Sequence, residues 1–193
     1  MKNRRSLKTF EIDKFKVSCH PDARDAYIYS KGINTYIDVI QKRSTIQSVD
    51  LLRENQQFNP LIAIEAAKQE LQYFSGWRWY EKCLAAEVNE VEVIVYEDFE
   101  NLNLRKVSWQ YLLSEHLYDM QRGSSLLQLV NLIKAIPKHL KTELLASNNA
   151  RSAITVVQNI TGETREAVRW SVNNAPATNT ESIAILDELL KGK

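Results

Sequence analysis

The chain has 193 residues, of which 44% are hydrophobic and 25% are charged, a composition typical of a folded globular protein rather than a long disordered one. The formal net charge of +1 gives no overall basic field, so nucleic-acid binding would have to come from local patches. Two cysteines are too few for a disulfide framework, and no residues have the spacing of a zinc site. No apolar run reaches membrane-spanning length, so we expect a soluble cytoplasmic protein without a membrane partner.

The first eight residues, MKNRRSLK, carry four basic side chains and no acid, which indicates a mobile basic arm containing Arg4 and Arg5. Residues 9–17 alternate imperfectly between hydrophobic and polar side chains and are predicted to form a strand. Residues 26–44 stay open between strand and helix, because their β-branched content competes with helical spacing.

The middle of the chain alternates between helical and strand patterns. The patterns predict, in order, a helix at 48–55, a break at the proline of QFNP, strands at 61–66 and 69–74, a helix from Gly76 to about Ala86, and a strand at 91–99. Gly76 is therefore a candidate phosphate-binding turn, because glycine lets the backbone approach a phosphate and helix N–H groups bind it. The alternative is a packed corner, in which the helix buries Trp79, Tyr80, Cys83 and Ala86.

After residue 100 only helical spacing is convincing. Helices are predicted within 108–120, 124–136 and 137–146, with Pro137 at a helix start. Residues 173–180 have the composition of a linker, and Thr180 is expected to cap a last helix at 181–190. We therefore expect an α+β protein with a mixed domain at 1–105 and an all-helical domain at 106–193.

Residues 150–172 resemble the helix-turn-helix pattern of DNA-binding proteins, which has a glycine, a Ser or Thr two positions later and an aliphatic residue six positions later. Gly162, Thr164 and Val168 stand at these places. Gln158 departs from the pattern, because a small residue is usual where the two helices cross. The alternative is an ordinary helical hairpin.

The order of elements over 9–172 resembles the ParB/sulfiredoxin superfamily. Members carry a Q-x-x-P turn before a strand, a glycine that opens a helix, and a V-P-V-x-V strand; here these are Gln57 to Pro60, Gly76 and VEVIV at 91–95. Glu115 and His116 occupy the first two positions of a loosened E-N-x-x-R box, and Arg122 is a displaced form of its arginine.

The resemblance implies a nucleotide pocket, which holds CTP in ParB proteins and ATP in sulfiredoxins, with Mg²⁺. Its phosphate-binding residues would be Gly76, Arg78, Lys82 and Gln57. Two departures concern this pocket: Trp79 stands where the family has arginine, and Trp77 stands at the position of the sulfiredoxin cysteine. The residues themselves specify no cofactor and no metal site.

These patterns lead to the hypothesis of a ParB-like protein that binds double-stranded DNA, acting in plasmid or chromosome partition or in transcriptional regulation. Arg165, Arg169 and Thr164 would contact the duplex, together with Arg4 and Arg5 of the arm. The last helix would pack against its own chain or contact a second copy of the chain in a homodimer.

Two alternatives remain open. One is a nucleotide hydrolase or nuclease on the same fold, with Glu115 and His116 as the catalytic candidates. The other is a non-catalytic adaptor that binds a partner protein through the aromatic front domain.

Overall fold

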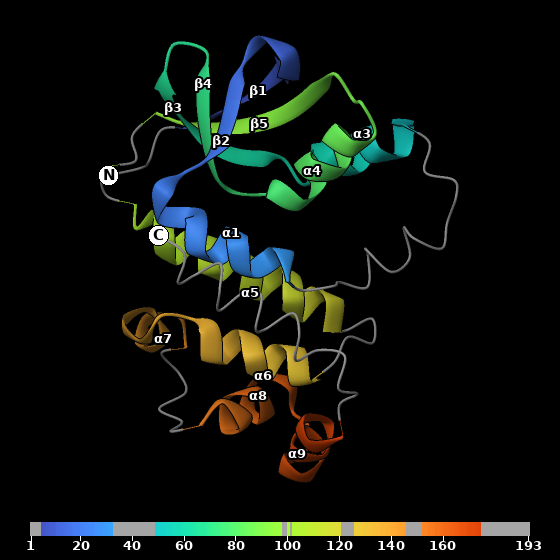
Figure 1. Ribbon diagram of the computed structural model, residues 1–193, viewed down its shortest axis with the longest axis vertical. Helices are drawn as coiled ribbons and strands as arrows, with labels where there is room; N and C mark the ends of the chain where they lie inside the picture. Colours follow the sequence, from blue (N-terminus) through green and yellow to red (C-terminus); the bar gives the residue numbers. More distant parts are fainter. Residues whose placement is uncertain are drawn as a thin grey trace. The chain divides into compact units, whose positions relative to one another are not determined.

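The computed structural model describes residues 5–32, 49–97, 100, 102–120, 126–145 and 152–174 (Figure 1). Within these ranges the chain divides into two compact units. The first contains residues 5–24 and the described part of 49–111, and the second contains residues 25–32 and the described part of 112–174.

Strands and helices follow the α+β order that the sequence predicts. In the described part of the chain the strands are β1 (Arg5–Glu11), β2 (Lys16–Cys19), β3 (Leu61–Ala67), β4 (Glu70–Ser75) and β5 (Glu90–Tyr96). The helices are α1 (Arg24–Lys31), α3 (Val49–Phe58), α4 (Trp77–Ala85), α5 (Leu104–Met120), α6 (Leu126–Ala135), α7 (Lys138–Leu144), α8 (Ala153–Thr161) and α9 (Arg165–Asn173), with short 3-10 helices η1 (Ile12–Lys14) and η2 (Pro21–Ala23). A mixed sheet followed by helices confirms the predicted fold class.

The described strands form one five-stranded sheet in the order β1-β5-β3-β4-β2. The pairs β1–β5 and β3–β4 are antiparallel, and the pairs β3–β5 and β2–β4 are parallel. Strands β3 and β4 form a hairpin whose turn contains Gln69 in the left-handed region at φ 62°. The predicted strands at 61–66, 69–74 and 91–99 are confirmed as β3, β4 and β5.

The prediction of one strand over residues 9–17 is wrong. The segment contributes to two strands, β1 and β2, which η1 separates and which lie at opposite edges of the sheet. The hydrophobic alternation changes phase between Ile12 and Phe15, and the chain turns at that point, where Lys14 also pairs with Glu11 at 2.6 Å. A strand requires an unbroken period of two.

The prediction of a mobile basic arm is wrong for residues 5–8. Arg5 and its neighbours pair with β5, with Arg5 opposite Tyr96 and Lys8 opposite Val93. Arg4 lies outside the described residues. The ambiguous segment 26–44 begins as helix α1, and its part beyond residue 32 is outside the described ranges, as is the expected last helix at 181–190.

Helices α3 and α4 pack against each other and on the sheet, with α3 against β5 and α4 against β3. Gln56, which is 1% exposed, joins α3 to β5. Its Nε2 donates to the carbonyl oxygen of Glu92 at 2.6 Å, and the backbone N–H of Glu92 donates to its Oε1 at 2.7 Å. The side-chain amide thus continues the hydrogen bonding of β3 to β5 at a point just before β3 begins at Leu61, which pairs with Val93.

The second unit is built around α6. Five apolar residues of α6 are buried, and this helix packs against both α8 and α9, which also pack against each other. The buried residues of these three helices are Leu127, Leu129, Val130, Leu132, Ile133, Val156, Val157 and Val168. None of the described helices combines the length and apolar character needed to cross a membrane.

Replacing Gln56 with leucine, which has a similar size, is expected to lower the free energy of unfolding by about 2–4 kcal/mol, because two buried backbone groups of Glu92 lose their partners. The matched control is Gln57→Leu at the neighbouring, exposed position, which is expected to change stability by less than about 0.5 kcal/mol. Urea unfolding followed by circular dichroism measures both. Equal losses in the two variants would contradict the role assigned to Gln56.

Candidate functional site

The glycine of the predicted phosphate turn joins β4 to α4. Gly76 has φ 75°, in the left-handed region that residues with a Cβ rarely adopt. A Cβ at this position would also lie 2.3 Å from the carbonyl oxygen of Pro60 and 3.0 Å from the Cα of Leu61. Packing of the chain on itself therefore requires a glycine here, whether or not a phosphate binds at the start of α4.

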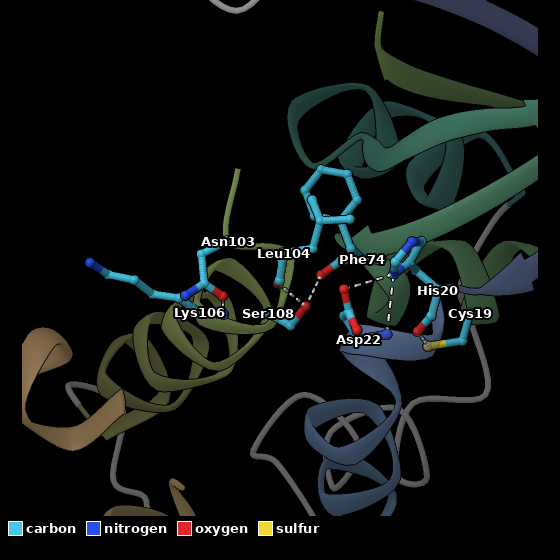
Figure 2. Close-up of polar contacts among 8 residues, drawn as sticks. All are labelled: Cys19, His20, Asp22, Phe74, Asn103, Leu104, Lys106 and Ser108. Carbon is cyan, nitrogen blue, oxygen red and sulfur yellow. Dashed lines mark hydrogen bonds and ion pairs between the residues drawn. The ribbon is translucent and has the colours of Figure 1, made fainter. Parts of the chain in front are cut away.

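A side-chain hydrogen bond joins the end of β4 to the first turns of α5 (Figure 2). The Ser108 hydroxyl lies 2.8 Å from the carbonyl oxygens of both Phe74 and Leu104, so it can donate to either. The side chain of Asn103 accepts from the backbone N–H of Lys106 at 3.0 Å and caps the first turn of α5. Because Phe74 lies two residues before Gly76, these contacts fix the direction in which the chain enters the glycine corner.

A second group of polar contacts in Figure 2 caps the 3-10 helix η2. The backbone N–H of Asp22 donates to Nδ1 of His20 at 3.1 Å, so in the neutral imidazole the ring proton is on Nε2. The Cys19 thiol donates to the carbonyl oxygen of His20 at 3.5 Å. Within the described ranges, no three His, Cys, Asp or Glu side chains are grouped so as to hold a metal ion.

The two cations of the predicted phosphate site both contact the protein. Arg78 is half-buried, its Nη1 and Nη2 atoms are buried, and it interacts with other groups of the chain. The Nζ of Lys82 lies 4.9 Å from the centroid of the Trp79 ring, a cation–π contact. The side chain of Gln57 is exposed, whereas its neighbour Gln56 holds β5. The role of all four predicted ligands in phosphate binding stays a prediction.

The buried face of α4 begins one residue after the glycine. Trp77 is fully buried and meets the Tyr111 ring edge-to-face at a centroid distance of 4.6 Å. Tyr80 and Cys83 continue this face, as expected, whereas Trp79 is only half-buried, as Ala86 is too. Burial raises the pKa of the Cys83 thiol, which lowers the fraction of nucleophilic thiolate at a given pH.

The two predicted catalytic residues follow each other in α5. His116 is 1% exposed and Glu115 is half-buried. Successive positions of a helix point about 100° apart, so the two side chains leave α5 in different directions. Both belong to the second unit, whereas Gly76 and its neighbours belong to the first. Arg122, the displaced arginine of the same motif, lies outside the described residues.

The segment in which a helix-turn-helix is predicted forms two short helices, α8 and α9, and its assignment as a DNA-binding motif stays a prediction. The Ser152 hydroxyl accepts from the backbone N–H of Thr155 at 3.3 Å and starts α8. Gly162 ends α8 in the left-handed region at φ 73°, and its N–H donates to the carbonyl oxygen of Gln158 at 2.9 Å. The Thr164 hydroxyl then accepts from the backbone N–H of Ala167 at 3.2 Å and starts α9, as expected.

The buried side chain of Val168 fixes which face of α9 is turned outward. Val168 is 0% exposed and lies in the unit where α6, α8 and α9 pack together. Gln158, the departure from the family pattern, is half-buried in α8. The exposed side of α9 carries Arg165, Glu166, Arg169, Trp170 and Asn173.

No protein-family model and no curated protein matches the chain. Among solved structures, the chain is similar to a Pnob8-like ParB-N domain, with a TM-score of 0.42 and 12% identity over 99% of this chain and 74% of that chain. It is also similar to the C-terminally truncated chromosome-partitioning protein ParB from Caulobacter crescentus complexed with CTP-gamma-S, with a TM-score of 0.31 and 14% identity over 96% of this chain and 99% of that chain. At these identities and TM-scores, the two similarities assign neither a family to the chain nor a role to any residue.

Replacing Gly76 with alanine is expected to lower the free energy of unfolding by about 3 kcal/mol or more, because the new Cβ would collide with the Pro60 carbonyl in addition to the cost of positive φ. Gly162→Ala is the matched control, since Gly162 has nearly the same φ but no atom within 4 Å of an added Cβ. It is expected to cost only about 1–2 kcal/mol. Urea unfolding of both variants tests this, and equal losses would show that steric contact at Gly76 is unimportant.

Proposed function

We propose that this protein binds double-stranded DNA through the α8–α9 helix pair, with α9 in the major groove. The observation that carries the proposal is the exposed side of α9, where Arg165 and Arg169 lie one turn apart while Val168 holds the opposite side in the core. A groove-reading helix needs this combination, because it must be fixed to its own domain and still present long polar side chains to base edges.

The caps of the two helices also support this function. Gly162 and Thr164 define a tight turn: the Gly162 N–H bonds to the end of α8, and the Thr164 hydroxyl accepts from the start of α9, so α9 is held at a defined angle to α8. Base readout depends on such rigid placement, because each hydrogen bond to a base edge tolerates only a small error in position.

The charges of this region indicate that the binding energy does not come from α9 alone. Glu163 and Glu166 offset the charges of Arg165 and Arg169. Elsewhere in the same unit the exposed Lys134 and Lys138 lie on α6 and α7. We assign general attraction to the phosphates to such lysines and base contacts to α9.

The process that this binding serves, either partition of a plasmid or chromosome or transcriptional regulation, is what the sequence resemblance implies. The proposal names no nucleotide and no nucleotide hydrolase or nuclease. The contact with Pro60 requires a glycine at position 76 whether or not a phosphate binds, so Gly76 does not support such a site.

The adaptor alternative has one specific observation in its favour. Phe58, at the end of α3, is 84% exposed, and Leu84 of α4 is 41% exposed. An adaptor of this kind binds a protein through the first unit and predicts that substitutions in α9 leave its interaction unchanged.

The double substitution Arg165→Ala/Arg169→Ala is expected to weaken binding to a short duplex, enriched from a random pool by selection on the parent protein, by at least about tenfold, because each base-contacting arginine contributes about 1–3 kcal/mol. Fluorescence anisotropy at several salt concentrations measures the affinity, which should also fall steeply with salt in the parent.

The matched control is Arg53→Ala/Lys68→Ala, which removes the same charge from two exposed positions of the first unit. It is expected to bind as the parent does. If both double variants lose affinity equally, the effect is one of net charge and the assignment of α9 is wrong. If the parent binds no duplex, the proposed function is wrong.

A further inference from the structure

The exposed side of α9 contains an aromatic residue that the arginines do not explain. Trp170 is 68% exposed and directly follows Arg169. The main chain at this residue is held in place, because the side-chain amide of Asn174 donates to the Trp170 carbonyl oxygen at 2.9 Å. A large indole therefore projects from a well-fixed point of the helix that the proposed function assigns to DNA.

The exposed residues of α9 recur with helical spacing and form one face. Arg165 and Arg169 are four residues apart, Glu166 and Trp170 are likewise four apart, and Asn173 follows Trp170 by three. Positions three and four apart are neighbours on the surface of a helix. Asn173 is four residues from Arg169 and three from Trp170, so it neighbours both and connects the arginines to the indole across this face.

Each polar residue of this face matches an edge of a base pair in the major groove. Arginine pairs with the two acceptors of guanine, asparagine with adenine, and glutamate with the amino group of cytosine. The indole of Trp170 has a single N–H donor and no acceptor, so it cannot match a pair of polar groups on a base edge. The apolar feature of the major groove is the 5-methyl group of thymine, which is recognised by apolar contact.

We infer that Trp170 reads thymine by packing its ring against the 5-methyl group in the major groove, an inference that rests on the proposed function. The balance of charge around α9 favours this contact over attraction to phosphates. Glu163, in the turn before α9, and Glu166 together offset Arg165 and Arg169, so residues 163–173 have no net charge with which to attract phosphates. Burial of the exposed indole supplies binding energy that these charges do not.

The test compares thymine with uracil, which forms the same base pair but lacks the methyl group. Short duplexes enriched from a random pool by selection on the parent protein are synthesised in both forms, and affinities are measured by anisotropy. The parent is expected to bind the uracil form more weakly, by roughly fourfold for each methyl group that it buries. Trp170→Ala is expected to bind both forms equally, with the affinity of the parent for the uracil form or lower.

Two control variants accompany this comparison. Trp170→Phe keeps an aromatic ring and is expected to retain part of the preference for thymine. Leu84→Ala removes an exposed apolar side chain from the first unit and is expected to retain all of it. Circular dichroism shows whether each variant is folded, which is expected because both side chains are exposed.

The outcomes separate this inference from the function on which it rests. If the parent binds neither duplex, both are overturned. If the parent binds thymine and uracil forms equally well, duplex binding stands and the inference is overturned. It is also overturned if Trp170→Ala weakens both forms by the same factor, as a phosphate or stacking contact predicts. A change of oligomeric state in sedimentation of Trp170→Ala would instead assign the indole to contact with a second copy of the chain.

Discussion

The first unit depends on the close approach of two backbone segments, Gly76 and the Pro60–Leu61 peptide. Gly76, between β4 and α4, lies so close to the start of β3 that a Cβ on residue 76 would not fit. Gln56 lies on the other side of the same turn and binds the backbone of β5 through both ends of its amide. The turn at residues 57–60 is thus held between α4 and β5, and the placement of β3 in the middle of the sheet follows from it.

The two left-handed glycines show why the sequence left the candidate sites undecided. Gly76 and Gly162 have almost the same φ, and each stands next to the end of a helix. At Gly76 the chain needs both the backbone conformation and the absence of a side chain, whereas at Gly162 it needs the conformation alone. A sequence pattern contains the glycine but not the atoms that face it, so a phosphate turn and a packed corner look the same.

Patterns with a local cause could be predicted from the sequence. The alternation in VEVIV predicted the strand β5, and the spacing of Gly162 and Thr164 predicted the turn between α8 and α9. Features with a distant cause could not. The pairing of β2 with β4 joins residues that are 54 positions apart, such as Lys16 and Glu70. The residues around position 15 contain no pattern that predicts this pairing.

The sequence contains a signal for the structural role of Gln56. Leu52 and Gln56 are one turn apart, and both are buried, so the spacing marks Gln56 as a core position of α3. The family pattern instead drew attention to the neighbouring Gln57, which is exposed. A polar residue on the apolar face of a helix is a candidate for a structural hydrogen bond, because its burial without a partner would be costly.

The short segment of residues 5–19 supplies both outer strands of the sheet, and this has a consequence for folding. Although β1 is synthesised before β5, it can pair only once β5 is present, more than eighty residues later, and pairings of such long sequence separation form slowly. Until they form, the outward-facing edges of β5 and β4 present unpaired backbone groups, which are templates for pairing with another chain. Residues 5–19 therefore protect the sheet against aggregation, because β1 covers the edge of β5 and β2 covers the edge of β4. Loss of this segment would expose both edges at once.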